Sequence, residues 1–525
     1  MNDHRWAWMA LLGCVAVSVS LAPSQTASAS KSEEYLLLGS PNRGAGEPFV
    51  FVNPKDHNNI IVAAMATLNH LPGGESPIPR GQPGSTEIRV KEFSVPDGSR
   101  TDIAITRDGG KTWNIGEDNF RKVFKKNRCA DSFAGAGPDG TLYVGCLAYV
   151  NLGDADFDLG YGPDGSPRRR HGGSAIAWST DKGVTWSNPV MVHPTEPQTP
   201  SLYPPNVHPV FEQASPYDRP VFAADASTGT IYVSSSGLAY TVDPATVPRP
   251  KVDPSLQGRG YTGFPPSSVT RGRTFMRASH DRGRTWGSVI YPVDSDEYPG
   301  GRGGFTAAYG NLAVAYTASR VPQSLNTNCP CTVFGTSRDD GKTFQYKVVP
   351  PLGERGSAGE PGGGMMLSAD PSSENTYALA RQSGQTIKVS FTRDGGKTWS
   401  EPVVAAQVPE GVRFGHRAMK YSAKGDLALI WKAMYPGGET YGTNSQKIGR
   451  FDVWSSLSRD GGKVFKTVRV SHEVSPPYIL ERSNFLFGDD LSSVDVDDQY
   501  VHVVWGDNRA GFQGTWYGRV PLSAY

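Results

Sequence analysis

The segment Thr106–Trp113 reads TRDGGKTW, and five later segments repeat its pattern of Ser/Thr-x-Asp-x-Gly-x-Thr-Trp. The other copies are STDKGVTW (Ser179–Trp186), SHDRGRTW (Ser279–Trp286), SRDDGKTF (Ser337–Phe344), TRDGGKTW (Thr392–Trp399) and SRDGGKVF (Ser458–Phe465). A period of roughly 55 to 100 residues is typical of a repeat architecture, in which each copy belongs to one supersecondary unit. We call each copy an octapeptide, and the six together predict a protein built from repeated units.

The residue types within one octapeptide predict a tight turn. Asp108 can accept hydrogen bonds from local backbone amides, and Gly110 can adopt a positive φ without steric cost. Trp113 supplies a large apolar ring, which we expect to be buried against the neighbouring unit. The octapeptide is therefore predicted to fasten a hairpin.

The octapeptides resemble the Asp-box (BNR) repeat of the sialidase superfamily. Four copies match at every position, whereas Phe344 and Phe465 replace Trp and Val464 replaces Thr. The resemblance implies a β-propeller with each octapeptide between the third and fourth strands of a blade, on the face away from the active site. The Arg-Ile-Pro motif of sialidases is absent, and Ile78-Pro79-Arg80 is only a scramble of it. The resemblance therefore implies the scaffold but not the catalytic residues, and a sialidase proper is not expected.

The repeated apolar segments predict the number of blades. Two short apolar segments precede each octapeptide, as expected for strands buried between stacked sheets. A seventh pair, Leu491–Val496 and Tyr500–Trp505, has no octapeptide and is followed by a third strand around Thr515–Pro521. Tyr35–Leu38 can supply the missing fourth strand and so protect the sheet edge. We therefore predict an all-β, seven-bladed β-propeller of four-stranded antiparallel blades closed by the N-terminal strand, with six blades as the alternative.

The N-terminus and the composition suggest an exported protein. Residues 1–29 are expected to be a secretory signal peptide, with a basic start, an apolar run over Trp6–Leu21 and the small residues Ala27-Ser28-Ala29 before cleavage. Residues 30–525 are predicted to form a single domain that is extracellular or periplasmic. The formal net charge of +1 gives no electrostatic case for a nucleic-acid or membrane partner, and we expect a monomer.

Four cysteines follow the signal peptide. Cys129 and Cys146 flank a predicted hairpin with its turn at Pro138-Asp139-Gly140, so we predict a disulfide between them in an oxidising compartment. Cys329-Pro330-Cys331 is compatible with a local disulfide or with two free thiols, since a zinc site would need a second pair of ligands. This choice stays open on the sequence.

Propellers bind ligands around the central axis, where the first strands begin and the second strands end. The candidate catalytic groups at this mouth are Glu47, Asp131, Asp218, Glu360, His416, Asp489 and Asp490. The candidate substrate-binding groups are Arg219, Arg302, Arg381, Arg417, Arg509, Tyr149 and Tyr435. Paired carboxylates serve glycoside hydrolysis, and clustered arginines hold a carboxylate or sulfate by bidentate bonds. For any single residue, the alternative is a structural cap or an ion pair between blades.

These observations predict a secreted, sialidase-like glycoside hydrolase that acts on an acidic glycan at the face opposite the octapeptides. One alternative is a polysaccharide lyase on uronate glycans with His416 as base. Another is a non-catalytic module that binds glycan or protein. No cofactor is expected to be required. Asp154, Asp156 and Asp158 have the alternate carboxylates that open a calcium loop, so bound Ca²⁺ is the alternative to a solvated acidic loop there.

Overall fold

The structure of the protein is a computed structural model. The structure describes residues 32–40, 43–68, 100–115, 128–151, 170–193, 217–240, 270–293, 297–298, 300–350, 366–436, 440–441, 446–447, 450–475, 491–510 and 512–525. The expected signal peptide lies outside these ranges, and so does the acidic segment with the expected calcium alternative. Within these ranges, no helix is both long and apolar enough to cross a bilayer.

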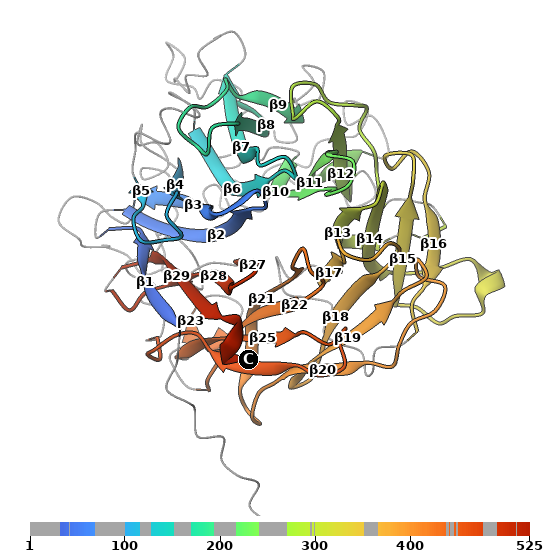
Figure 1. Ribbon diagram of the computed structural model, residues 1–525. Helices are drawn as coiled ribbons and strands as arrows, with labels where there is room; N and C mark the ends of the chain where they lie inside the picture. Colours follow the sequence, from blue (N-terminus) through green and yellow to red (C-terminus); the bar gives the residue numbers. More distant parts are fainter. Residues whose placement is uncertain are drawn as a thin grey trace, which may run out of the picture.

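Seven antiparallel blades surround one axis, and the chain passes once around the ring (Figure 1). Blade 1 contains β2 (Arg43–Asn53), β3 (Asp56–Leu68), β4 (Arg100–Thr106) and β5 (Asn114–Ile115). Blade 2 contains β6 (Arg128–Ala136), β7 (Leu142–Asn151), β8 (Arg170–Ser179) and β9 (Val190–His193). Blade 3 contains β10 (Tyr217–Ala224), β11 (Ile231–Tyr240) and β12 (Thr270–Ser279), and a single bridge from Ile290 to Met276 takes the place of its fourth strand.

The remaining blades have four strands each. Blade 4 contains β13 (Gly300–Ala308), β14 (Asn311–Ala318), β15 (Cys331–Ser337) and β16 (Gln345–Val348). Blade 5 contains β17 (Met366–Ala369), β18 (Tyr377–Ser383), β19 (Thr386–Thr392) and β20 (Val403–Gln407). Blade 6 contains β21 (Arg413–Tyr421), β22 (Leu427–Met434), β25 (Phe451–Ser458) and β26 (Lys466–Arg469), and the short pair β23 (Thr440–Tyr441) and β24 (Gln446–Lys447) lies between its second and third strands.

Blade 7 joins the two ends of the chain. It contains β27 (Ser492–Val496), β28 (Tyr500–Asp507), β29 (Gly514–Pro521) and the N-terminal β1 (Glu33–Leu38). β1 pairs antiparallel with β29, with Tyr35 opposite Tyr517. This arrangement confirms the predicted seven blades and the predicted closure, and it excludes the six-bladed alternative.

The octapeptides form one repeated turn after the third strand of blades 1 to 6. In the first copy, the Thr106 hydroxyl donates to Asp108 Oδ1 at 2.7 Å and accepts from the Gly110 amide at 2.9 Å. Asp108 also accepts from the amide and the hydroxyl of Thr112, at 2.9 and 2.6 Å. The glycine at the fifth position has a φ between 82° and 89° in every copy, which a side chain would strain. In the last copy the Val464 amide still donates a hydrogen bond to Asp460 Oδ1, but valine has no hydroxyl that could donate a second one.

Each turn fastens its blade to the blade before it. The Trp113 ring lies 5.1 Å from the Tyr517 ring of blade 7, and the Trp399 ring lies 5.3 Å from the Phe334 ring of blade 4. A Cβ added to Gly396 would lie 2.6 Å from Phe334, so the glycine also permits the close approach. The prediction that the octapeptide aromatic packs against the neighbouring unit is confirmed.

Blade 7 carries no octapeptide and is held differently. Buried His502 in β28 contacts the Tyr517 hydroxyl at 2.7 Å through Nδ1 and Asp497 Oδ2 at 2.9 Å through Nε2. The Tyr35 hydroxyl of β1 accepts from Trp113 Nε1 at 2.6 Å. The Tyr35 and Tyr517 rings lie 5.5 Å apart, so these hydrogen bonds and this ring contact together link the strands of blade 7 to the first octapeptide.

The apolar core is divided among the seven blade interfaces, each of which holds a cluster of buried side chains. Between blades 5 and 6, for example, Phe391 and Leu427 belong to one cluster. Burying a side chain of this size contributes about 1.5–3 kcal/mol. Because the apolar core lies between neighbouring blades, the residues at the ends of the first strands can line the central axis.

Two disulfides are present among the described cysteines. Cys329 is bonded to Cys331, with Cα atoms 4.4 Å apart, which decides the choice that the sequence left open. Cys146 is also disulfide-bonded. The side chain of Cys129 lies outside the described part, so its pairing with Cys146 stays a prediction.

We expect an Asp108→Asn variant to have a lower melting temperature than the wild type at pH 7. The Thr112 hydroxyl lowers the pKa of Asp108 to about 2, so its stabilising contribution is complete above the ordinary pKa of about 4 and is lost as the pH falls toward 2. The difference in melting temperature between the two proteins should therefore narrow over that interval. Calorimetry at several pH values measures it, and a difference that does not depend on pH would contradict this account.

Candidate active site

Five first strands carry a β-bulge near the face opposite the octapeptides. At each bulge, two residues of the first strand face a single residue of the second strand. The bulge pairs are Glu47-Pro48, Asp131-Ser132, Arg219-Pro220, Gly301-Arg302 and Gly415-His416. Bulges bend a strand and redirect its side chains, and they are common beside active sites. Five predicted site residues are therefore bulge residues.

The bulges of blades 1 and 2 each present a carboxylate. Glu47 and Asp131 have φ values of 52° and 45°, in the left-handed region that disfavours residues with a side chain. Such backbone costs on the order of 1–3 kcal/mol and persists only where the surroundings fix it. β2 begins at Arg43, so Glu47 lies inside the strand, not at its start as predicted. The bulge accounts for this difference because it turns the chain where the carboxylate lies.

These two bulges are neighbours in space. The Asp131 amide donates to Met65 Sδ at 3.2 Å, and Met65 pairs with Gly46, the residue before Glu47. Thr101 Oγ1 of blade 1 lies 2.6 Å from Ser132 Oγ of blade 2. The interface between blades 1 and 2 therefore holds both carboxylate-bearing bulges side by side.

The bulge of blade 6 carries His416, with Arg417 directly after it. Both side chains are half-buried. Opposite the bulge is Lys432, whose Nζ donates to the Gly506 carbonyl of blade 7 at 3.0 Å and lies 4.8 Å from the Phe451 ring centroid. Lys432 is fully buried. It fixes the second strand behind His416 to the next blade.

The structure places other predicted residues only in part. The side chains of Arg219, Arg302, Asp218 and Tyr149 lie outside the described part, although their backbones lie in β10, β13 and β7. Glu360, Asp489 and Asp490 lie outside the described residues altogether. Their roles stay predictions.

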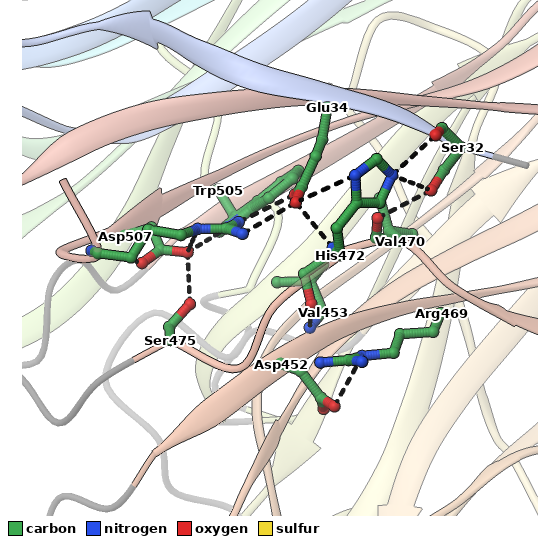
Figure 2. A network of polar contacts seen from close by, with 12 residues as sticks. Ser32, Glu34, Asp452, Val453, Arg469, Val470, His472, Ser475, Trp505 and Asp507 are labelled. Atoms are coloured by element: carbon green, nitrogen blue, oxygen red, sulfur yellow. Dashed lines mark hydrogen bonds and ion pairs between the residues drawn. The ribbon is translucent and has the colours of Figure 1, made fainter. Parts of the chain in front are cut away.

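Within blade 7, Arg509 connects Glu34 of β1 with Asp507 at the end of β28, two residues that Figure 2 labels. Its Nη1 and Nη2 donate to the two carboxylate oxygens of Glu34, each at 2.9 Å, and its Nε donates to Asp507 Oδ2 at 3.0 Å. Asp507 also accepts from Ser475 and Trp505, and Glu34 accepts from the His472 amide at 2.7 Å. The guanidinium therefore has a structural function, and the predicted role in substrate binding stays a prediction.

Tyr435 belongs to a second buried cluster, in blade 6. Its hydroxyl donates to Asp452 Oδ2 at 3.0 Å, while Trp454 Nε1 donates to Oδ1 at 2.7 Å. Arg469 Nε lies 3.1 Å from the same carboxylate (Figure 2). Burial raises the pKa of Asp452, and burial likewise raises the pKa of Tyr435 to about 12. The sequence did not indicate Asp452, because a single aspartate in an apolar strand has no distinguishing signal.

Arg381 lies between blades 4 and 5. Its Nη1 donates to Thr332 Oγ1 at 2.6 Å, directly after the Cys329–Cys331 disulfide. Burial lowers the pKa of this guanidinium. The sequence placed Arg381 at the end of a second strand, and β18 does end nearby, at Ser383.

No protein-family model and no curated protein sequence matches the chain. Among solved structures, a protein of unknown function from Dyadobacter fermentans is similar with a TM-score of 0.42 and 12% identity, over 93% of this chain and 97% of that one. A Hadza microbial sialidase gives 0.41 and 14%, over 81% and 73%. The NanB sialidase from Streptococcus pneumoniae gives 0.40 and 10%, over 94% of each chain. At these scores the likeness carries no argument, and the architecture rests on the strand pairing itself.

We expect Glu34→Gln to lower the free energy of unfolding by about 1.5–3 kcal/mol, because the buried Arg509 loses its bidentate carboxylate partner and keeps only Asp507. The side chains of Glu34 and Arg509 are only 4% and 8% exposed. Glu33→Gln is the matched control, since Glu33 pairs with Arg519 but is 58% exposed, and it should cost less than about 1 kcal/mol. Urea-induced unfolding measures both. Equal effects of the two substitutions would contradict the structural function of Arg509.

Proposed function

We propose that this protein is a secreted glycoside hydrolase that acts on an acidic glycan at the face opposite the octapeptides. The observation that supports it best is the pair of neighbouring bulges that hold Glu47 and Asp131 in left-handed backbone. Hydrolysis of a glycosidic bond needs two carboxyl groups, one as general acid and one as base or nucleophile. Two strained carboxylate residues side by side at a propeller mouth suit this requirement.

The two carboxyl groups are assigned different roles by their surroundings. Glu47 is 6% exposed, and burial favours the neutral form of a carboxyl, so Glu47 is the proposed general acid. Asp131 is half-buried and is the proposed base or nucleophile. Water supplies the hydroxyl that replaces the leaving sugar.

The basic residues of the other bulges support an acidic substrate. Arg302 and Arg219 occupy the bulges of blades 4 and 3, and Arg417 follows the bulge of blade 6. Guanidinium groups bind carboxylate and sulfate through paired hydrogen bonds. A glycan bearing such groups is therefore the proposed substrate.

The test is a screen of the protein against fluorogenic glycosides and acidic polysaccharides, repeated with Glu47→Gln and Asp131→Asn. Each substitution should lower kcat by at least about 100-fold, as expected for loss of an acid–base group. Glu374→Gln and Asp498→Asn, at exposed carboxylates of the octapeptide face, are the matched controls and should leave kcat unchanged.

Several results would overturn the proposal. Unchanged turnover in both mouth variants would exclude these carboxyl groups from catalysis. A product that absorbs in the ultraviolet through a new double bond would instead identify a uronate lyase, with His416 as the base to test. Binding of glycans without any cleavage would identify a binding module.

A further inference from the structure

A cavity lies on the propeller axis, at the face that carries the octapeptides. It encloses about 450 Å³, and all seven blades contribute to its lining. Its rim includes Lys55 and His57, close to the first hairpin turn of blade 1. The same hairpin contacts two octapeptides, because the Gly109 amide donates to the Asn58 carbonyl at 2.9 Å and Lys182 pairs with Asp56 at 2.7 Å. The cavity therefore opens opposite to the proposed active site.

Apolar side chains form one part of the wall. Phe51 of blade 1 and Phe222 of blade 3 line the cavity, with ring centroids 6.1 Å apart in an edge-to-face arrangement. Ala136 of blade 2 and Ala223 of blade 3 complete this side. Aromatic faces of this kind bind apolar or ring-shaped bodies.

Most acceptor side chains in the rest of the wall contact other groups of the protein: Asp497 contacts His502, and the exposed Asp498 pairs with Lys424. Thr306 Oγ1 and Ser368 Oγ accept from backbone amides of the next blade, each at 3.1 Å. Asp495 Oδ2 accepts from the Val52 amide at 2.8 Å, and its Oδ1 accepts from the Val496 amide at 2.9 Å. Except for the bond from Val496, these hydrogen bonds from backbone amides join one blade to the next.

The donor groups, in contrast, remain available. Lys420 Nζ lies 2.9 Å from Asp495 Oδ1 and 4.1 Å from the Phe51 ring centroid, and its side chain is 34% exposed. An ammonium group has three donors, and the described residues provide one acceptor for them. Among those same residues, the side chains of Lys55 and His57 have no hydrogen-bond or ion-pair partner. The cavity thus offers donors beside an apolar wall.

We infer that this axial cavity binds a small acid, with its carboxylate on Lys420 and an apolar or ring-shaped body against Phe51 and Phe222. The volume falls in the range of small-molecule sites, about 300–1,000 Å³. A free organic acid and a uronic acid share this chemistry, so both are probes in the test. The inference adds a second site and does not depend on the proposed hydrolase activity.

The full chain is titrated by calorimetry with cyclohexanecarboxylate and glucuronate, and with the neutral matches cyclohexanecarboxamide and glucose. At least one acid should bind about tenfold or more tightly than its neutral match, because a charge-assisted hydrogen bond is lost in the match. Tighter binding of cyclohexanecarboxylate would identify an organic-acid site, and tighter binding of glucuronate a uronate site. Equal binding of acids and neutral matches, or no binding by any probe, would overturn the inference.

Variants locate the binding. Lys420→Met removes the ammonium group. Ala223→Leu fills the cavity and leaves the ion pair between Lys420 and Asp495 intact. If both variants lose binding, misfolding of the Lys420→Met protein cannot be the explanation. Each should weaken binding of the preferred acid about tenfold or more. Lys463→Met is the matched control, because this exposed lysine of the last octapeptide lies outside the cavity wall. The Glu47→Gln variant should bind the preferred acid as tightly as the wild type does. This result would show that the acid binds in the axial cavity and not at the mouth. Wild-type affinity in both cavity variants would overturn the inference.

Discussion

The structure depends on the aspartate of each octapeptide and the hydrogen bonds that it accepts. Asp108 holds the amide and hydroxyl of Thr112 and so fixes one turn in which Gly110 can take a left-handed backbone. That turn aims an aromatic ring at the preceding blade. Six such contacts set the spacing between blades, and this spacing determines where the first strands meet around the axis. The six aspartates thus help to determine how the first strands are arranged around the axis.

The sequence predicted the fold well because its signals are local and repeated. An octapeptide needs only eight neighbouring residues to define its turn, and the strands beside it carry ordinary apolar patterns. The seventh unit, which has no octapeptide, was predictable because Leu491–Val496 and Tyr500–Trp505 repeat the apolar pattern of the other units. In addition, Tyr35–Leu38 had no other predicted strand to pair with. The structure confirms both, with β1 beside β29.

The candidate site was predictable only in outline, because its geometry depends on contacts between distant segments. Strand ends suggested Glu47, Asp131 and His416, but nothing showed that bulges redirect them; the prolines after Glu47 and Arg219 were the one available signal. Arg509 illustrates the opposite case. It lies where a ligand-binding arginine would lie, yet its partner Glu34 is 475 residues away, and only the closed ring brings them together.

Closure by the N-terminal strand has a consequence for the order of assembly. The pairing of Tyr35 with Tyr517 joins segments at opposite ends of the chain, so the entropy of closing the whole loop must be offset in one step. Blades 1 to 6 can form from neighbouring residues as the chain emerges. Blade 7 cannot form in this way, because its outer strand, β1, is synthesised before the other six blades and pairs with β29, which is synthesised after them. The propeller therefore closes only when β29 is available to pair with β1.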